Sequence, residues 1–172
     1  PRVLPVPIVI VQHMPPLFTK MLAERLTKTS GMAFYEGEEG QPVEVGRAYI
    51  APGGKHMRLR REGGNVRVHL TEEPPENSCR PAVDVLFRSA LEVYGAGTLA
   101  VVMTGMGQDG LRGCQSIREA GGSILAQDEA SSVVWGMPGA VVHAGLAEAV
   151  VPLPRLAESI WQKFQLAKSS SA

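Results

Sequence analysis

Two uninterrupted apolar runs stand out along the chain, at residues 7–12 and 98–104. Neither run alternates with polar positions, which is typical of strands buried on both faces of a parallel sheet. Shorter runs at 47–51, 123–126 and 147–151 predict three further strands. The chain therefore carries enough strands of the buried type to build a mostly parallel sheet.

Apolar residues at helical spacing separate these strands. Phe18, Met21, Leu22 and Leu26 form one such stripe, and Gly31 ends the helix that it predicts. Similar stripes predict helices over 81–94, 111–120, 138–144 and 153–166. Because strands and helices alternate, we expect an α/β, doubly wound architecture.

One segment departs from that alternation. Residues 57–61 and 66–70 each alternate with period two around a glycine-rich tip, which predicts an antiparallel hairpin added to the fold. One face of this hairpin is basic, and we interpret it as a solvated strand face. We expect a single domain over 1–172, with a loose tail at 168–172.

Charge and composition exclude several classes of protein. The 172 residues carry 17 basic and 17 acidic side chains, whereas nucleic-acid binders usually carry a basic excess. No apolar run approaches 18 residues, so we expect no membrane insertion. The two cysteines, Cys79 and Cys114, show neither a disulfide framework nor zinc-knuckle spacing. We expect no bound metal and no cofactor.

Candidate chemistry lies where the two buried strands end. His13 follows the first strand, and Thr104-Gly-Met-Gly-Gln-Asp-Gly110 follows the second. The carboxyl ends of strands in open α/β sheets are where ligands and catalytic groups gather. We therefore expect His13 and Asp109 to face one crevice.

The second of these loops also matches the GxGxxG pattern of dinucleotide-binding proteins, at Gly105, Gly107 and Gly110. A phosphate binds such a loop through bare N–H groups at a helix N-terminus. Asp109 places a carboxylate in that pocket and would repel the phosphate. Nucleotide binding therefore stays a minor alternative.

The residues alone leave the roles of His13 and Asp109 open. An aspartate before a helix serves as its N-cap or, held as an anion, orients a histidine for proton transfer. His13 is correspondingly a hydrogen-bonded structural residue or a general base. His56, His69 and His143 are weaker candidates.

No serine stands where a hydrolase would need it. The chain lacks a GxSxG elbow, and Ser78, Ser131 and Ser132 lie in predicted turns or loops. Cys79 is conceivable as a nucleophile, although nothing in the sequence indicates an activated thiolate.

Five motifs in fixed order point to a known family. They are Val9–Pro15, Ala51–His56, Arg80–Phe87, Met103–Gly110 and Ala126–Pro138. Together they resemble the catalytic domain of the chemotaxis protein-glutamate methylesterase, over residues 5–152. Each motif alone has modest specificity for the family, but the occurrence of all five in this order is very specific.

This resemblance implies a Ser-His-Asp hydrolase of the response-regulator methylesterase family. It implies hydrolysis of glutamate γ-methyl esters, and deamidation of certain glutamines, on the cytoplasmic helices of chemoreceptors. The family's histidine falls on His13, its aspartate on Asp109, and Met106 stands beside the histidine near the oxyanion. We expect a cytoplasmic protein of the chemotaxis phosphorelay.

The family's serine lies in a glycine-rich elbow that precedes all five motifs, and many members also carry an N-terminal receiver domain. We therefore expect the nucleophile upstream of Pro1, and residues 1–172 alone to be inactive. The alternative is a non-catalytic receptor-binding or regulatory module that keeps the scaffold without the nucleophile.

Overall fold

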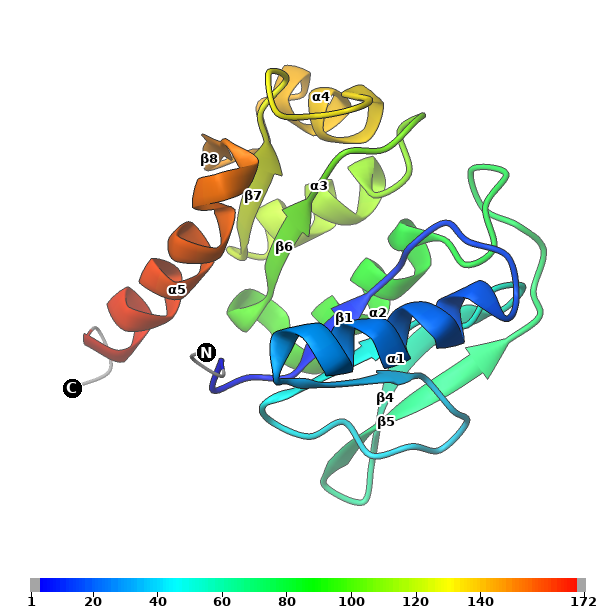
Figure 1. Cartoon of the computed structure of the whole chain (residues 1–172). Coiled ribbons are helices and arrows are strands. Elements are labelled where there is room, and N and C mark those ends of the chain that lie inside the picture. Colours follow the sequence, from blue (N-terminus) through cyan, green and yellow to red (C-terminus); the bar gives the residue numbers. More distant parts are fainter. Residues whose placement is uncertain (1–3, 170–172) are drawn as a thin grey trace. The chain divides into compact units, whose positions relative to one another are not determined.

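The computed structural model describes residues 4–169 and divides the chain into two compact units, Pro1–Gly95 and Ala96–Ala172. Each unit has its own parallel sheet, and each is described by itself (Figure 1). The single-domain prediction stays a prediction.

The sheet of the first unit has the strand order β1-β3-β2, and all of its pairs are parallel. Its strands are β1 (Ile8–Ile10), β2 (Ala33–Glu36) and β3 (Arg47–Ile50). Helix α1 (Phe18–Ser30) connects β1 to β2 and ends at Gly31, as the pattern predicted. Strand β2 was not predicted, because its four half-buried residues follow Gly31 almost directly and show neither a buried run nor an alternation.

The predicted hairpin is confirmed as β4 (His56–Glu62) and β5 (Asn65–Thr71), which pair antiparallel. Its tip is Gly63-Gly64, where both residues have positive φ, a conformation that glycine adopts without strain. Helix α2 (Val83–Tyr94) follows, and a short 3-10 helix (Gly95–Gly97) comes next.

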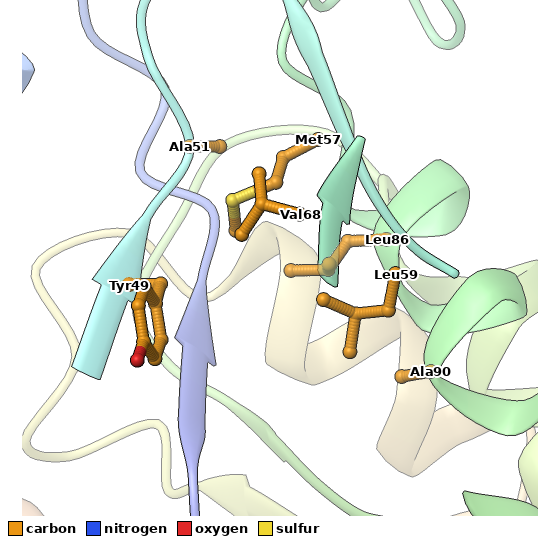
Figure 2. Close-up of a cluster of buried hydrophobic side chains, with 7 residues drawn as sticks. All are labelled: Tyr49, Ala51, Met57, Leu59, Val68, Leu86 and Ala90. Carbon is orange, nitrogen blue, oxygen red and sulfur yellow. The ribbon is translucent and has the colours of Figure 1, made fainter. Parts of the chain in front are cut away.

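The core of the first unit lies among β3, the hairpin and α2 (Figure 2). Leu59 and Val68 are directly opposite each other in the hairpin, and both are almost completely buried. Leu86 and Ala90 are four residues apart on α2, so they present one face of the helix to this cluster. The cluster consists of Tyr49, Ala51, Met57, Leu59, Val68, Leu86 and Ala90.

The second unit has the parallel strand order β6-β7-β8. Its strands are β6 (Leu99–Val102), β7 (Ser123–Gln127) and β8 (Ala149–Val151). Its helices are α3 (Leu111–Glu119), α4 (Gly136–His143) and α5 (Leu153–Ser169). Leu125, Val151 and Leu156 form a buried cluster in this unit.

The predicted α/β class, with parallel strands and one antiparallel hairpin, is confirmed. Helix α5 continues to Ser169, two residues into the segment 168–172 that was predicted as a loose tail, and residues 170–172 lie outside the described residues. No helix within residues 4–169 combines the length and apolar character needed to cross a bilayer.

Candidate active site

His13 lies exposed in the loop that joins β1 to α1. This loop is held by a close approach of the chain at Gly53. A Cβ atom at Gly53 would lie 2.3 Å from the Pro16 nitrogen and 2.4 Å from the Pro15 carbonyl carbon. The Gly53 N–H also donates to the Thr19 hydroxyl at 3.0 Å. Only glycine at position 53 lets the segment next to His13 take this course.

Cys79 lies beside His13, although the two residues are far apart in sequence. A ring nitrogen of His13 and Sγ of Cys79 lie within 4.8 Å of each other. The cysteine is half-buried and the histidine is exposed. The first unit therefore places a thiol against the imidazole that the sequence singled out.

A tight turn holds Cys79 in that position. The N–H of Glu76 donates to the carbonyl of Cys79 at 3.0 Å, and the N–H of Cys79 donates back at 2.9 Å. Asn77 and Ser78 between them both have positive φ, the conformation of a two-residue hairpin turn. The backbone of this cysteine is thus fixed on both sides of the turn.

The same turn is attached to α2 through side chains. The Arg88 guanidinium donates to both carboxylate oxygens of Glu76, at 2.7 and 2.6 Å. The Asn77 amide donates to the buried carboxylate of Asp84 at 2.8 Å. The two parallel hydrogen bonds of a bidentate arginine–carboxylate pair strengthen the contact and also fix the relative orientation of the two groups. The pair therefore holds this turn in a defined position on α2.

The glycine turn at 53–54 also contacts the segment after Cys79. The N–H of Gly54 donates to the carbonyl of Arg80 at 3.2 Å, whereas Gly53 packs against the loop of His13. Both loops of the His13–Cys79 pair are therefore held by one turn.

In the second unit, the loop between β6 and α3 carries Asp109 and Met106. Its first residues are held by Gln127, which is completely buried at the end of β7. The Gln127 side-chain carbonyl accepts the N–H of Thr104 at 2.9 Å, and its amide donates to the carbonyl of Ser131 at 2.8 Å. The sequence did not single out Gln127.

The glycine pattern of this loop has structural causes. Gly105 forms backbone hydrogen bonds with Val134 at 2.9 Å and with Met137 at 2.8 Å. A Cβ atom there would lie 2.4 Å from the Met137 sulfur. Gly107 and Gly110 have positive φ. Packing and turn conformation therefore account for the GxGxxG match without a nucleotide.

Asp109 is 2% exposed, whereas Met106 is 82% exposed. The N-cap position of α3 is occupied by Gly110. The interpretation of Asp109 as the N-cap residue is therefore wrong by one position, because the left-handed Gly110 stands between the aspartate and the helix. The loop buries the carboxylate and presents the methionine.

The other histidines have structural contacts. The buried His56 ring accepts the Ala82 N–H at Nδ1 and contacts the Pro74 carbonyl through Nε2. His143 meets the Trp135 ring edge-on at 5.3 Å between centroids. His69 contacts the Glu39 carboxylate at 2.9 Å.

Glu39 has the clearest electrostatic consequence of these contacts. The Leu70 backbone N–H, followed by the His69 side chain, lowers the pKa of the Glu39 carboxyl below its ordinary value. Glu39 lies between β2 and β3, and its carboxylate bonds His69 and Leu70 of the hairpin strand β5.

The serines after β7 are engaged in a turn. The Ser131 hydroxyl donates to the Asp128 carboxylate, and the Ser132 hydroxyl donates to the Asp128 carbonyl at 2.6 Å. Both lie between β7 and α4, but the joining segment spans residues 128–135, which is longer than the sharp strand-to-helix turn of a nucleophile elbow.

This chain is similar in sequence and fold to CheB methylesterases. Residues 1–160 match the family model described as CheB methylesterase. A protein-glutamate methylesterase/protein-glutamine glutaminase of Trichodesmium erythraeum is 58% identical over 159 residues, which are 92% of this chain and 45% of that protein. A second, of a group 2 operon in Rhodopseudomonas palustris, is 55% identical over 158 residues, or 92% of this chain and 40% of the relative.

A solved structure agrees with these sequence matches. The crystal structure of the Thermotoga maritima CheB methylesterase catalytic domain is 43% identical, with a TM-score of 0.90 over 92% of this chain and 84% of that one. The chain spans less than half the length of the two curated relatives. On the match of residues 1–160, the chain belongs to the CheB methylesterase family.

Proposed function

We propose that this chain is the catalytic part of a protein-glutamate methylesterase and protein-glutamine glutaminase. It hydrolyses glutamate γ-methyl esters, and deamidates glutamines, on the cytoplasmic helices of chemoreceptors. The activity for which the two relatives are named supports this proposal. The observation that carries the proposal is the family match over residues 1–160, which includes both candidate catalytic loops.

The positions of the two loops support the assignment of residues. His13 follows β1, the first parallel strand of its unit, and Asp109 follows β6, the first parallel strand of the other. Strand ends of this kind are where α/β proteins carry their chemistry. We assign His13 as the general base and Asp109 as the carboxylate that orients it.

The proposed reaction proceeds through a serine ester. The serine hydroxyl attacks the ester carbonyl, and His13 takes its proton and passes it to the departing methoxide as methanol leaves. Water then attacks the acyl-enzyme with His13 again as base, which frees the glutamate carboxylate and restores the serine. With a glutamine substrate, ammonia leaves in place of methanol.

Asp109 and Met106 have different proposed roles in these steps. The Asp109 carboxylate accepts an N–H of His13, selects its tautomer and stabilises the imidazolium that forms. The low exposure of Asp109 supports this role, because a buried carboxylate interacts more strongly with a charged partner. Met106, exposed in the same loop, supports the region in which the oxyanion forms.

The nucleophilic serine is assigned to a segment outside residues 1–172. Ser131 and Ser132 support this assignment, because both hydroxyls take part in the turn after β7. We also propose that the full-length protein carries a fused receiver domain and acts in the cytoplasm.

Methanol release from a methylated receptor fragment tests the proposal. In the full-length protein, His13→Ala should abolish turnover, and Asp109→Asn should lower kcat by about 10³–10⁴-fold. His69→Ala is the matched control, because His69 is a histidine of the same unit that contacts Glu39 at the hairpin.

Three results would contradict parts of this proposal. Turnover by His13→Ala would exclude the imidazole from the mechanism. A decrease in kcat of less than about tenfold for Asp109→Asn would show that this carboxylate does not orient His13. Receptor binding without hydrolysis by the full-length wild-type protein would favour the non-catalytic module.

A further inference from the structure

We propose that His13 and Cys79 form a binding site for a thiophilic divalent cation, Zn²⁺ above all. The site is formed within the first unit by two loops that lie far apart in the sequence. Sequence spacing had predicted no metal, because that reasoning considered only ligands at short, regular intervals. The metal-binding part of this proposal does not depend on the proposed function.

The separation of the two ligand atoms suits such an ion. Zinc binds imidazole nitrogen at about 2.0 Å and thiolate sulfur at about 2.3 Å, so tetrahedral geometry places these two atoms about 3.5 Å apart. The His13 nitrogen and the Cys79 sulfur lie within 4.8 Å without an ion. The pair therefore needs at most about 1.3 Å of movement to reach the tetrahedral separation.

The backbone around the pair is fixed, which lowers the entropic cost of binding. Cys79 and Glu76 bond each other on either side of a two-residue turn. The Glu76 carboxylate in turn accepts two hydrogen bonds from Arg88. The turn at Gly53 and Gly54 packs against the His13 loop and bonds the carbonyl of Arg80. Preorganised ligands of this kind bind a cation more tightly than the same residues on mobile chains.

The donor atoms select the class of ion. One imidazole nitrogen and one thiolate sulfur are ligands for zinc and other borderline or soft ions, whereas magnesium and calcium require oxygen. Binding forms a metal–sulfur bond and a metal–nitrogen bond, and the Cys79 thiol releases its proton to solvent. Water molecules complete the coordination, since the histidine is exposed.

The effect on activity rests on the proposed function. A metal bound to His13 uses the nitrogen lone pair with which the imidazole would take a proton from the nucleophile. The cation therefore acts as a reversible inhibitor of the esterase, and Cys79 determines its affinity.

Cobalt binding tests the site without any measurement of activity. When Co²⁺ is added to the purified full-length protein, a Co²⁺–thiolate charge-transfer band should appear and should disappear on addition of Zn²⁺. Cys79→Ser should abolish the band and weaken zinc binding by at least about tenfold. His13→Ala should weaken zinc binding similarly. The control Cys114→Ser changes the other thiol of the chain and should keep the band.

Absence of the band in the wild-type protein, or its persistence in Cys79→Ser, would overturn the proposed site and leave the esterase proposal standing. Zinc should also inhibit methanol release by the wild-type protein, and a chelator should restore it. Cys79→Ser should require at least about tenfold more zinc for the same fractional inhibition. Metal binding with a normal band but without inhibition would overturn the inhibitory role alone.

Discussion

The side-chain carbonyl of Gln127 accepts the backbone N–H of Thr104 at 2.9 Å. This bond connects the buried end of β7 to Thr104, the second residue of the loop that leads from β6 to Asp109. The Thr104 hydroxyl continues the connection, because it accepts the N–H of Val134 at 2.9 Å. A completely buried amide thus holds the start of the candidate catalytic loop.

We predict that Gln127→Leu lowers both stability and turnover. The substitution leaves the Thr104 N–H and the Ser131 carbonyl without their partner, which should lower the free energy of unfolding by about 1–3 kcal/mol. A catalytic loop displaced by about 1 Å should lower kcat by roughly tenfold to a hundredfold, with a smaller change in KM. Urea unfolding and steady-state methanol release measure these effects.

Gln115→Leu is the control, since Gln115 lies exposed on α3 and contacts only the neighbouring turn at Glu119 among its described hydrogen bonds. Its unfolding free energy should stay within about 0.5 kcal/mol of the wild-type value. A Gln127→Leu protein that loses stability but keeps wild-type kcat would show that the amide supports the fold without positioning the loop.

A second prediction concerns Gly53→Ala. The new methyl group would meet the backbone of Pro15 and Pro16 at 2.3–2.4 Å, so the segment beside His13 must shift. We expect a loss of about 1–3 kcal/mol in stability from this overpacking, and lower turnover from the displaced imidazole. Thermal unfolding and methanol release measure the two effects.

Gly97→Ala provides the comparison, because a Cβ atom at Gly97 would meet nothing within 4 Å. That variant should keep wild-type turnover. If Gly53→Ala also kept it, the close approach at Gly53 would have no part in positioning His13.

The sequence predicted the two candidate loops because the pattern that marks each loop lies in consecutive residues. A buried apolar strand is followed directly by His13 in one case and by the segment around Asp109 in the other. In α/β proteins with parallel sheets, catalytic groups gather at such strand ends. The hairpin was equally accessible, since period-two alternation and a Gly-Gly tip lie within sixteen residues, 56–71.

The relationships that the sequence did not predict depend on residues distant along the chain. Cys79 and His13 meet only because the 53–54 turn holds both loops, and no spacing rule describes that contact. Gln127 is the last residue of a strand whose sequence gives it no special role, and only the structure shows that its side chain accepts the N–H of Thr104. The division into two compact units was not predicted either, because both units use the same alternation of strands and helices.

A third prediction separates the structural histidine from the catalytic candidate. His56 accepts the Ala82 N–H at 3.2 Å through Nδ1, so its Nε2–H donates to the Pro74 carbonyl at 3.0 Å. His56→Leu removes both bonds from a ring that is 1% exposed. We expect about 2–4 kcal/mol lower stability in urea unfolding, since two buried partners are left unsatisfied.

His13→Ala is the matched variant for stability, because His13 is exposed. Its unfolding free energy should stay within about 1 kcal/mol of the wild-type value. The two histidines should thus show opposite profiles, with His56→Leu mainly affecting stability and His13→Ala mainly affecting turnover. Equal losses of stability would contradict this separation.

The last prediction is a pH dependence of stability. The Lys163 ammonium bonds the Glu148 carboxylate and, as the largest cause, lowers the pKa of Glu148 below its ordinary value of 4.5. A carboxyl with a lowered pKa in the folded state stabilises that state above its ordinary pKa, and the contribution is lost as pH falls through the lowered value. Glu148→Gln should therefore cost up to about 1 kcal/mol at neutral pH, because both side chains are partly exposed. Urea unfolding at several pH values should show the stabilities of the two proteins converging below about pH 4, and more closely at high salt.

Glu158→Gln is the control, because Glu158 lies on α5 with Lys163 and accepts a hydrogen bond from Gln162 at 3.4 Å. The unfolding free energy of this variant should stay within about 0.5 kcal/mol of the wild-type value at neutral pH. A Glu148→Gln difference that persisted unchanged into acid would show that this carboxylate stabilises the fold through packing and not through its charge.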